Sequence, residues 1–404
     1  NHWSECWIDV QLGLAHLAAG QPAQAKTSLQ RSLLAAGQFD HPLTGVALFE
    51  LGRIALAEGN LREAAGYFEE ATYSAAYYGD IGVLEEAFRQ GAVVHLLANP
   101  KTVYAPLPEA LAWANRNRYR QLTASLLVSL AENQAVLGNT AAADQTLREA
   151  SGLFKRREFA AGRLGAAYSF VGSRVLFQQK NTAAGDAAVA RAMDFMRQGS
   201  LWLFHVALAD RLYVDGVVTA RVATDLYATV LRDPQPLDWS LEPMESLAVL
   251  VTPHPVPFEH WFEAAVKRKA HEDALEISDR ARRHRFLATL PYGGRLDSLR
   301  WLLDGPEEFL DAQARLLRRD LLVSLPGYDR ASKEAAVARG RLAQLPPVAA
   351  DAPAAAVQGK ELADLAAISM IQETLLREVA VSRQPSDLVF PPLRRTADLR
   401  KALP

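Results

Sequence analysis

Half of the 404 residues are hydrophobic and 22% are charged, a composition typical of a folded protein that is too long for one ordinary core. The 44 lysines and arginines nearly balance the 46 aspartates and glutamates, which argues against a nucleic-acid binder or a strongly membrane-attracted surface. The single cysteine, Cys6, excludes a disulfide framework and a multi-cysteine zinc site, and it suits a reducing, cytoplasmic compartment. No apolar run approaches the roughly 18 residues of a membrane-spanning helix. Because the first residues contain neither Met nor a signal sequence, we expect an internal piece of a longer protein.

A pattern of small and large apolar residues recurs along the first half of the chain. It is clearest in Ala47–Ala71, which predicts two short helices joined by a turn at Gly59. Small residues such as Gly52 and Ala64 fall where the two helices must touch, and Phe68 fills the space beside them. The same position of the pattern is occupied, at intervals of 39 to 41 residues, by Leu12, Leu51, Gln90, Leu130 and Val171. The recurrence predicts an all-α solenoid of antiparallel helix pairs.

The turns of this solenoid show where the repeat is regular. Gly20, Gly59 and Gly138 follow the first helix of their units and supply the left-handed residue that ends many helices. The fifth unit lacks this glycine, and Asn181 or Thr182 is the expected N-cap of its second helix. In the third unit, three prolines between residues 100 and 108 predict a longer connection. We expect five to six units over residues 1–232.

The second half of the chain changes character. Residues 233–291 predict further helical pairs that end the solenoid, including Phe258–Lys269 and His271–Leu290. Residues 292–404 predict a region of long, coiled-coil-like linker helices. In the longest of these, apolar residues recur every three or four positions, at Leu362, Leu365, Ile368, Ile371, Leu375 and Val379.

Two segments resemble known families. The small and large positions of the repeat resemble tetratricopeptide (TPR) repeats over about Trp7–Ala192, although the tyrosine of that family's first helix is replaced by His16, Ala55 and Val94. Ala274–Leu290 resembles the last repeat helix of bacterial proteins that join TPR arrays to a caspase-like CHAT domain. The resemblance implies that long antiparallel helices follow, and that Pro392–Pro404 leads into a peptidase-like effector domain that lies beyond this chain.

Few residues suit chemistry. Cys6 could pair with one of nine histidines as a nucleophile, but no motif surrounds it, and a small core residue is the simpler interpretation. His260 and His271 lack the spacing of zinc ligands on one helix face. The glycine motifs of nucleotide-binding loops and of serine hydrolases are missing. We therefore expect no enzymatic activity, no cofactor and no metal in this chain.

Two sets of residues suit partner binding. In TPR-like arrays the first helices line a concave groove, and the resemblance places six residues there: Phe49, Arg53, Phe88, His95, Glu132 and Ser173. The two phenylalanines could instead pack between repeats. The groove lacks the lysine and asparagine set that grips a C-terminal carboxylate in chaperone-binding members of that family. The second set is a basic run that could dock on an acidic partner or simply be a solvated helix face: Arg280, Arg282, Arg283 and Arg285.

These observations favour a protein-interaction scaffold or sensor. It would recognise a protein or peptide partner, with no nucleic acid or membrane involved, and regulate a fused C-terminal effector domain. The alternative is a small-molecule-sensing regulatory TPR domain, which needs a cluster of polar residues converging in the groove.

Overall fold

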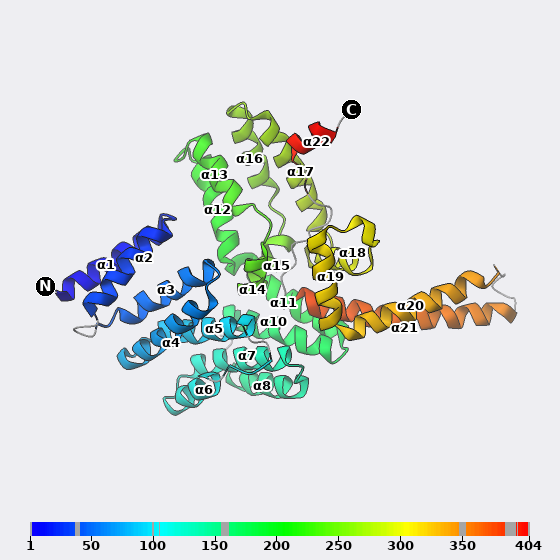
Figure 1. Cartoon of the computed structure of the whole chain (residues 1–404), viewed down its shortest axis with the longest axis horizontal. Coiled ribbons are helices and arrows are strands. Elements are labelled where there is room, and N and C mark those ends of the chain that lie inside the picture. The colour runs from blue at the N-terminus through cyan, green and yellow to red at the C-terminus, as the bar shows by residue number, and fades with distance from the viewer. Residues whose placement is uncertain are drawn as a thin grey trace. The chain divides into compact units, whose positions relative to one another are not determined.

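A computed structural model describes the chain as helices joined by turns. The described residues are 2–36, 41–98, 101–104, 106–154, 161–346, 353–383, 393 and 395–402. They contain no β-strand, and consecutive helices pack in antiparallel pairs, so the predicted all-α, TPR-like solenoid is confirmed (Figure 1). The chain divides into two compact units, Asn1–Val171 and Gly172–Pro404, and each is described by itself. Helical pairs occur on both sides of residue 232, where we predicted the first domain to end.

The first unit is a series of helical hairpins. It contains α1 (His2–Ala18), α2 (Pro22–Ala36), α3 (Thr44–Ala57), α4 (Leu61–Tyr78), α5 (Ile81–Ala98), α6 (Pro106–Arg116), α7 (Arg120–Val136), α8 (Thr140–Leu153) and the start of α10 (Arg163–Gln178). The closest pairs are α1 with α2, α3 with α4, and α7 with α8, and each hairpin also packs on the next. The best-formed predicted pair, Ala47–Ala71, lies within α3 and α4.

Small residues let the paired helices approach closely, as the sequence predicts. A Cβ atom at Gly52 would lie 2.7 Å from the ring of Phe68, so α4 packs directly against the backbone of α3. Ala55, Ala64 and Phe68 are completely buried in this hairpin. Cys6 is buried as well, and its thiol lies 3.7 Å from the carbonyl oxygen of Ser32 on α2. Cys6 is therefore a packing residue in this structure.

One turn geometry joins consecutive helices in both units. The second residue after the preceding helix adopts a positive φ, at Gly20, Gly59, Arg118, Gly138, Lys180 and Lys269. The next residue donates its N–H to the carbonyl five residues back, as in the 2.8 Å bond from Asn60 to Ala55. This arrangement satisfies carbonyl groups left free at the helix end. In the fifth unit, Lys180 takes the place of the missing glycine, and Asn181 caps α11 by accepting from the N–H of Ala184.

The second unit continues with helical pairs and ends in long helices. It contains the end of α10, α11 (Thr182–Gly199), α12 (Leu201–Val214), α13 (Ala220–Val230), α14 (Pro236–Leu241), α15 (Pro243–Val251), α16 (Pro255–Lys267), α17 (His271–Leu287), η1 (Pro291–Gly294), α18 (Arg295–Asp304), η2 (Glu307–Phe309), α19 (Ala312–Ser324), α20 (Pro326–Gln344), α21 (Pro353–Ala380) and α22 (Thr396–Ala402). Part of the predicted lead-in, Pro392–Pro404, lies outside the described residues.

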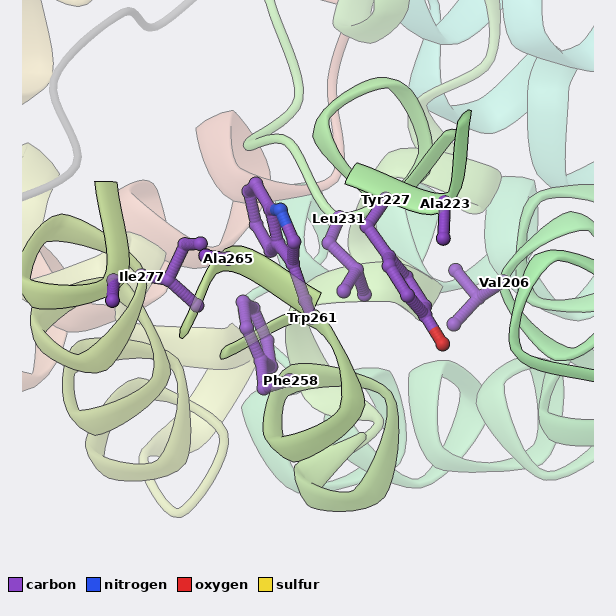
Figure 2. Packing of buried hydrophobic residues seen from close by; sticks show 9 residues of the cluster. Val206, Ala223, Tyr227, Leu231, Phe258, Trp261, Ala265 and Ile277 are labelled. Carbon is purple, nitrogen blue, oxygen red and sulfur yellow. The ribbon is translucent and has the colours of Figure 1, made fainter. Parts of the chain in front are cut away.

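The hairpins α12–α13 and α16–α17 share one apolar core (Figure 2). Tyr227 of α13 and Trp261 of α16 stack with their ring centroids 6.4 Å apart, and Phe258 stacks with Trp261 at 6.1 Å. The hydroxyl group of Tyr227 donates to Asp210 at 2.7 Å. Burial, followed by this hydrogen bond, raises the pKa of Tyr227. The ring is thus fixed at its polar end as well as its apolar face.

The helices α20 and α21 form a long antiparallel hairpin that projects beyond the other helices of its unit (Figure 1). Its seam differs from the predicted one. Leu362 and Ile371 are 56% and 45% exposed, so two of the six predicted seam residues lie on the outside. Polar contacts cross the hairpin instead, from Arg341 to Glu361 at 2.9 Å and from Gln372 to Ser332 at 2.9 Å. On α20 the buried face carries small residues: Ala331, Ala335 and Ala338.

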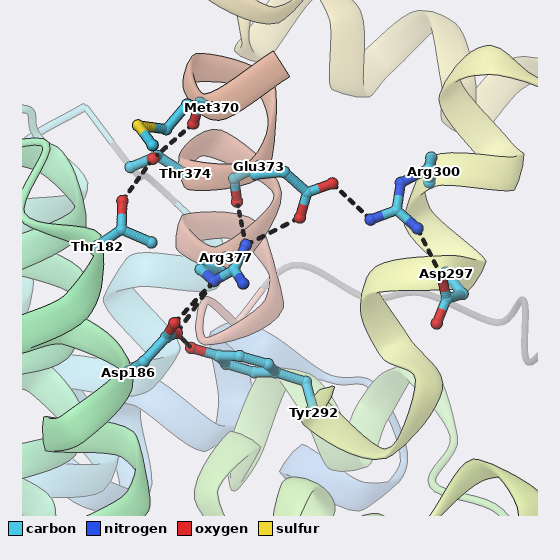
Figure 3. A network of polar contacts seen from close by, with 9 residues as sticks. All are labelled: Thr182, Asp186, Tyr292, Asp297, Arg300, Met370, Glu373, Thr374 and Arg377. Carbon is cyan, nitrogen blue, oxygen red and sulfur yellow. Dashed lines mark hydrogen bonds and ion pairs between the residues drawn. The ribbon is translucent and has the colours of Figure 1, made fainter. Parts of the chain in front are cut away.

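A network of charged side chains fixes the C-terminal half of α21 to two other helices (Figure 3). Arg377 of α21 donates to Asp186 of α11 at 3.0 Å and to Glu373 at 2.9 Å. Glu373 also accepts from Arg300 of α18 at 2.5 Å. The phenol of Tyr292 donates to Asp186 at 2.6 Å. We call these five residues the α21 clamp. Burial by itself would raise the pKa of Glu373, but the two arginines outweigh burial and lower it.

Candidate functional site: an aromatic cavity in the first unit

A cavity of 340 Å³ opens between α4, α5 and α6 of the first unit. Four aromatic side chains form much of its wall: Tyr73 from α4, Phe88 from α5, Tyr104 from the connection before α6, and Trp113 from α6. We call it the aromatic cavity. Its volume is within the range of pockets that hold a small molecule or a few side chains of a partner.

The irregular connection in the third unit builds one wall of this cavity. Pro106 begins α6, and Tyr104 lies two residues before it. The ring of Tyr104 packs where α5 has no side chain, because a Cβ atom at Gly91 would lie 2.5 Å from the phenol oxygen. The backbone N–H of Tyr104 donates to Asn133 of α7 at 3.3 Å. The longer connection predicted from the sequence therefore places the ring of Tyr104 against the backbone of α5.

The cavity carries carboxylates at its mouth. Glu69 of α4 and Glu109 of α6 are exposed, and neither makes an ion pair within the described part of the chain. Burial, followed by the charge of Glu69, raises the pKa of Tyr104 to about 12, so its phenol stays protonated and neutral. Arg116 lies at the end of α6 and is the one basic residue in the lining.

Aromatic faces with nearby carboxylates suit a cationic group. The ring faces attract a cation through their quadrupoles, at about 0.5–2 kcal/mol for each well-placed ring. The carboxylates add a charge-assisted hydrogen bond to an ammonium or guanidinium group. Tyr73 is 69% exposed, and an apolar ring that exposed gains from being covered by a ligand. The arrangement is therefore chemically suited to a lysine or arginine side chain of a partner.

The structure separates the six predicted groove residues. Phe88 lines the aromatic cavity, although only 9% of it is exposed and most of its ring belongs to the core. His95 lies behind the cavity, with its ring 5.5 Å from that of Tyr104 and its Nε2 atom 2.8 Å from the carbonyl oxygen of Thr102. Of the six, these two are brought near Tyr104.

The other four predicted residues lie elsewhere. Phe49 is half-buried and packs 5.9 Å from the ring of Phe68, which is the packing role that the sequence left open. Arg53 is exposed and pairs with Glu50 on its own helix at 3.0 Å. Glu132 is half-buried on α7. Ser173 on α10 is completely buried, so in this structure it presents no surface to a partner.

Sequence reasoning missed Tyr73, Tyr104 and Trp113. Tyr104 and Trp113 belong to the irregular third unit, where the counted positions of the repeat do not apply. The available signal was compositional, since a short segment that departs from the repeat carries two large aromatic rings. Tyr73 lies on the second helix of its unit, whereas the predicted groove used first helices only.

The basic run in the second unit divides into two pairs. Arg280 and Arg283 both reach Asp233, which lies just before α14, and Arg283 is nearly buried. These two arginines hold α17 in place. Arg282 and Arg285 are exposed, and they line a second cavity between α16 and α17. The predicted docking role is therefore left to the second pair.

The described residues show neither a membrane-spanning helix nor a group of metal ligands. Among the described helices, none combines the length and apolar character needed to cross a membrane. In the same part of the chain, no three histidine, cysteine or carboxylate residues are grouped as metal ligands would be.

Comparison with known proteins gives one match. No curated protein and no solved structure matches the chain. Residues 4–72 match the model of a tetratricopeptide repeat family. These residues cover α1–α3 and most of α4, the hairpins in which the repeat is most regular. The match and the helical pairs of the described residues together support a TPR-repeat protein, and TPR repeats generally mediate protein–protein interaction.

Proposed function

We propose that this chain recognises a protein partner by enclosing one of the partner's basic side chains in the aromatic cavity. The observation that carries the proposal is the juxtaposition of Tyr73, Tyr104 and Trp113 with Glu69 and Glu109 in one cavity. A lysine or arginine side chain has an aliphatic stem for the rings and a charged end for the carboxylates. The exposed mouth leaves room for the backbone of a peptide to pass across it.

The wider role remains that of an interaction scaffold. We propose that the chain acts in the cytoplasm without a cofactor, and that partner binding regulates a fused effector domain of the CHAT peptidase-like kind. The support is the resemblance of Ala274–Leu290 to the last repeat helix of such proteins, together with the long antiparallel helices that follow it. No residue of this chain is assigned a catalytic role.

Selection of random peptides displayed on phage tests the recognition. The full chain should enrich peptides that share one fixed lysine or arginine, and Trp113→Ala should lose that enrichment because it removes a wall of the cavity. Tyr73→Ala should weaken the binding of an enriched peptide by about tenfold. Tyr77→Ala is the matched control: it removes an equally exposed tyrosine one turn further along α4, outside the cavity.

Substitutions in the selected peptide then separate charge from shape. Replacing its basic residue with norleucine keeps the stem and removes the charge, and it should weaken binding about tenfold or more to the wild type. Glu109→Gln should reduce the difference in affinity between the basic and the norleucine peptide, because the carboxylate that pairs with the basic group is gone. Enriched peptides that share no basic residue, or that bind Trp113→Ala equally well, would contradict the proposed function.

A small-molecule sensor is the second candidate, favoured by the volume of the cavity. The same assay distinguishes it. Nα-acetyl-lysine amide is an isolated cation with a lysine-like stem. If it binds as tightly as the best peptide, the flanking residues of the peptide contribute nothing to affinity, and the cavity is a small-molecule site. We expect the peptide to bind at least about tenfold more tightly.

A further inference from the structure

The second unit contains a larger cavity, of 490 Å³, on the hairpin of α16 and α17. Its lining includes two phenylalanines and two glutamates from α16, together with two arginines from α17: Phe258, Phe262, Glu259, Glu263, Arg282 and Arg285. Phe258 is buried in the shared core of the unit, whereas Phe262 is 41% exposed. We call it the charged cavity. It lies outside the residues that match the TPR model.

The charges in this cavity are arranged by helix. Glu259 and Glu263 lie one turn apart on α16, and Arg282 and Arg285 lie one turn apart on α17. Like charges at this spacing weakly destabilise a helix. Yet no ion pair joins an arginine of α17 to a glutamate of α16, and within the described residues Glu263 has only a 4.0 Å contact with Lys267. The two signs therefore face a common space without neutralising each other.

The frame around these charges is firmly built. Arg280 and Arg283 bind Asp233, which leaves Arg282 and Arg285 on the exposed side of α17. The imidazole rings of His254 and His284 stack 4.2 Å apart beside the cavity. His284 donates its Nε2 proton to the carbonyl group of Thr252 at 3.1 Å. His284 of α17 is thereby joined to the segment that leads into α16.

We propose that the charged cavity binds a short aromatic zwitterion, an amino acid or dipeptide whose two ends are both free. The carboxylate of the ligand pairs with Arg282 and Arg285, and its ammonium group pairs with Glu259 and Glu263. Its aromatic side chain covers the exposed ring of Phe262. A ligand with a single charge pairs with one wall only, whereas a bipolar ligand gains charge-assisted hydrogen bonds from both walls. This site is independent of the proposed function of the aromatic cavity.

Calorimetric titration of the full chain with phenylalanine and with the dipeptide Phe-Phe tests this proposal. At least one of the two should bind. Capping that ligand with an N-acetyl group, or converting its carboxylate to an amide, should each weaken binding about tenfold or more. The double variant R282Q/R285Q should bind the uncapped ligand more weakly than the wild type does, by a similar factor. It should bind the uncapped ligand and its amide equally well.

The opposite wall gives the reciprocal result. E259Q/E263Q should bind the uncapped and the N-acetyl ligand equally well. It should still bind the amide more weakly than the uncapped ligand. R268Q and E334Q are matched controls, because both positions are exposed in the same unit and lie outside the cavity, and they should bind as the wild type does. All these side chains are exposed, so the variants should fold, which circular dichroism checks. Absence of binding by both uncapped ligands, or binding that ignores the caps or the cavity variants, would overturn the proposal.

Discussion

His254 and His284 lie in the second unit with their rings stacked, and both are largely shielded from solvent. Burial, together with the neighbouring His284, lowers the pKa of His254 from its ordinary value of 6.5 to about 3. Burial also lowers the pKa of His284, despite its hydrogen bond to Thr252. His254 is therefore neutral in the folded chain at pH 5, whereas a histidine of the unfolded chain takes up a proton there.

This difference predicts loss of stability in mild acid. Below pH 6.5 the unfolded state binds more protons than the folded state, so the free energy of unfolding falls as pH falls towards 3. Between pH 7 and pH 5 the loss should be about 2 kcal/mol, at 1.4 kcal/mol per pH unit below the unfolded pKa. Urea unfolding at the two pH values measures it, and His254→Gln should reduce the loss. His271→Gln, at an exposed position, should leave it unchanged. An equal loss in both variants would contradict this account.

At the same scale, single residues were the least predictable part of the site. The repeat pattern predicts Phe88 in a groove lined by first helices, but Phe88 lines instead a cavity between α4, α5 and α6. Ser173 occupies the repeat position of Arg53 and Glu132 but is completely buried, because the position alone does not report how neighbouring helices cover it. Tyr104 depends on a connection that follows no repeat, and its location rests on a bare backbone at Gly91 that only the structure reveals.

The hairpin of α20 and α21 shows how far periodicity identifies an element and its faces. The length and apolar content of α21 predicted a long helix correctly. Four of the six predicted seam residues are half-buried or buried, but Leu362 and Ile371 are exposed. Small residues on α20 and polar pairs at Glu361 and Gln372 complete the interface. A count of apolar residues cannot detect a seam built in this way.

Overpacking of that seam tests it. Ala338 of α20 is completely buried, and Ala338→Phe should force the two helices apart at a cost of about 1–3 kcal/mol in the free energy of unfolding. Val337→Phe places the same ring at the adjacent position, which is 58% exposed, and should change stability by less than about 0.5 kcal/mol. Urea denaturation followed by circular dichroism compares them. Equal costs would show that the small residues of α20 do not set the spacing.

At the scale of the whole molecule, the sequence predicted the class of fold. It held no sign of the division between the two units. That division falls between Val171 and Gly172, which occupy an ordinary position of the fifth repeat within one continuous helix, α10. The residues around this point fit the repeat pattern. The two units can be distinguished only by the contacts between helices that are distant in the sequence.

The α21 clamp joins three helices of the second unit, and its loss should make the C-terminal half of α21 open more often. Arg377→Gln removes the pairing with Asp186 and weakens the contact that holds Glu373 between two arginines. Amide hydrogen exchange should then become faster in residues 372–380, by about tenfold or more, because local opening no longer breaks this network. Residues 326–344 should exchange as before. Arg339→Gln, at an exposed position on α20, is the control, and equal acceleration in that variant would exclude a specific role for the clamp.

The shared turn of the hairpins has a consequence for how such a chain can change over evolutionary time. The joint needs one residue with positive φ and one backbone hydrogen bond, and even Arg118, Lys180 and Lys269 meet that need without glycine. Selection for folding therefore acts on a few joint and contact positions in each hairpin, while the outward faces are free to drift. Copies of one hairpin can acquire different ligands, such as a basic side chain at one and a zwitterion at another, without redesign of the scaffold that carries them.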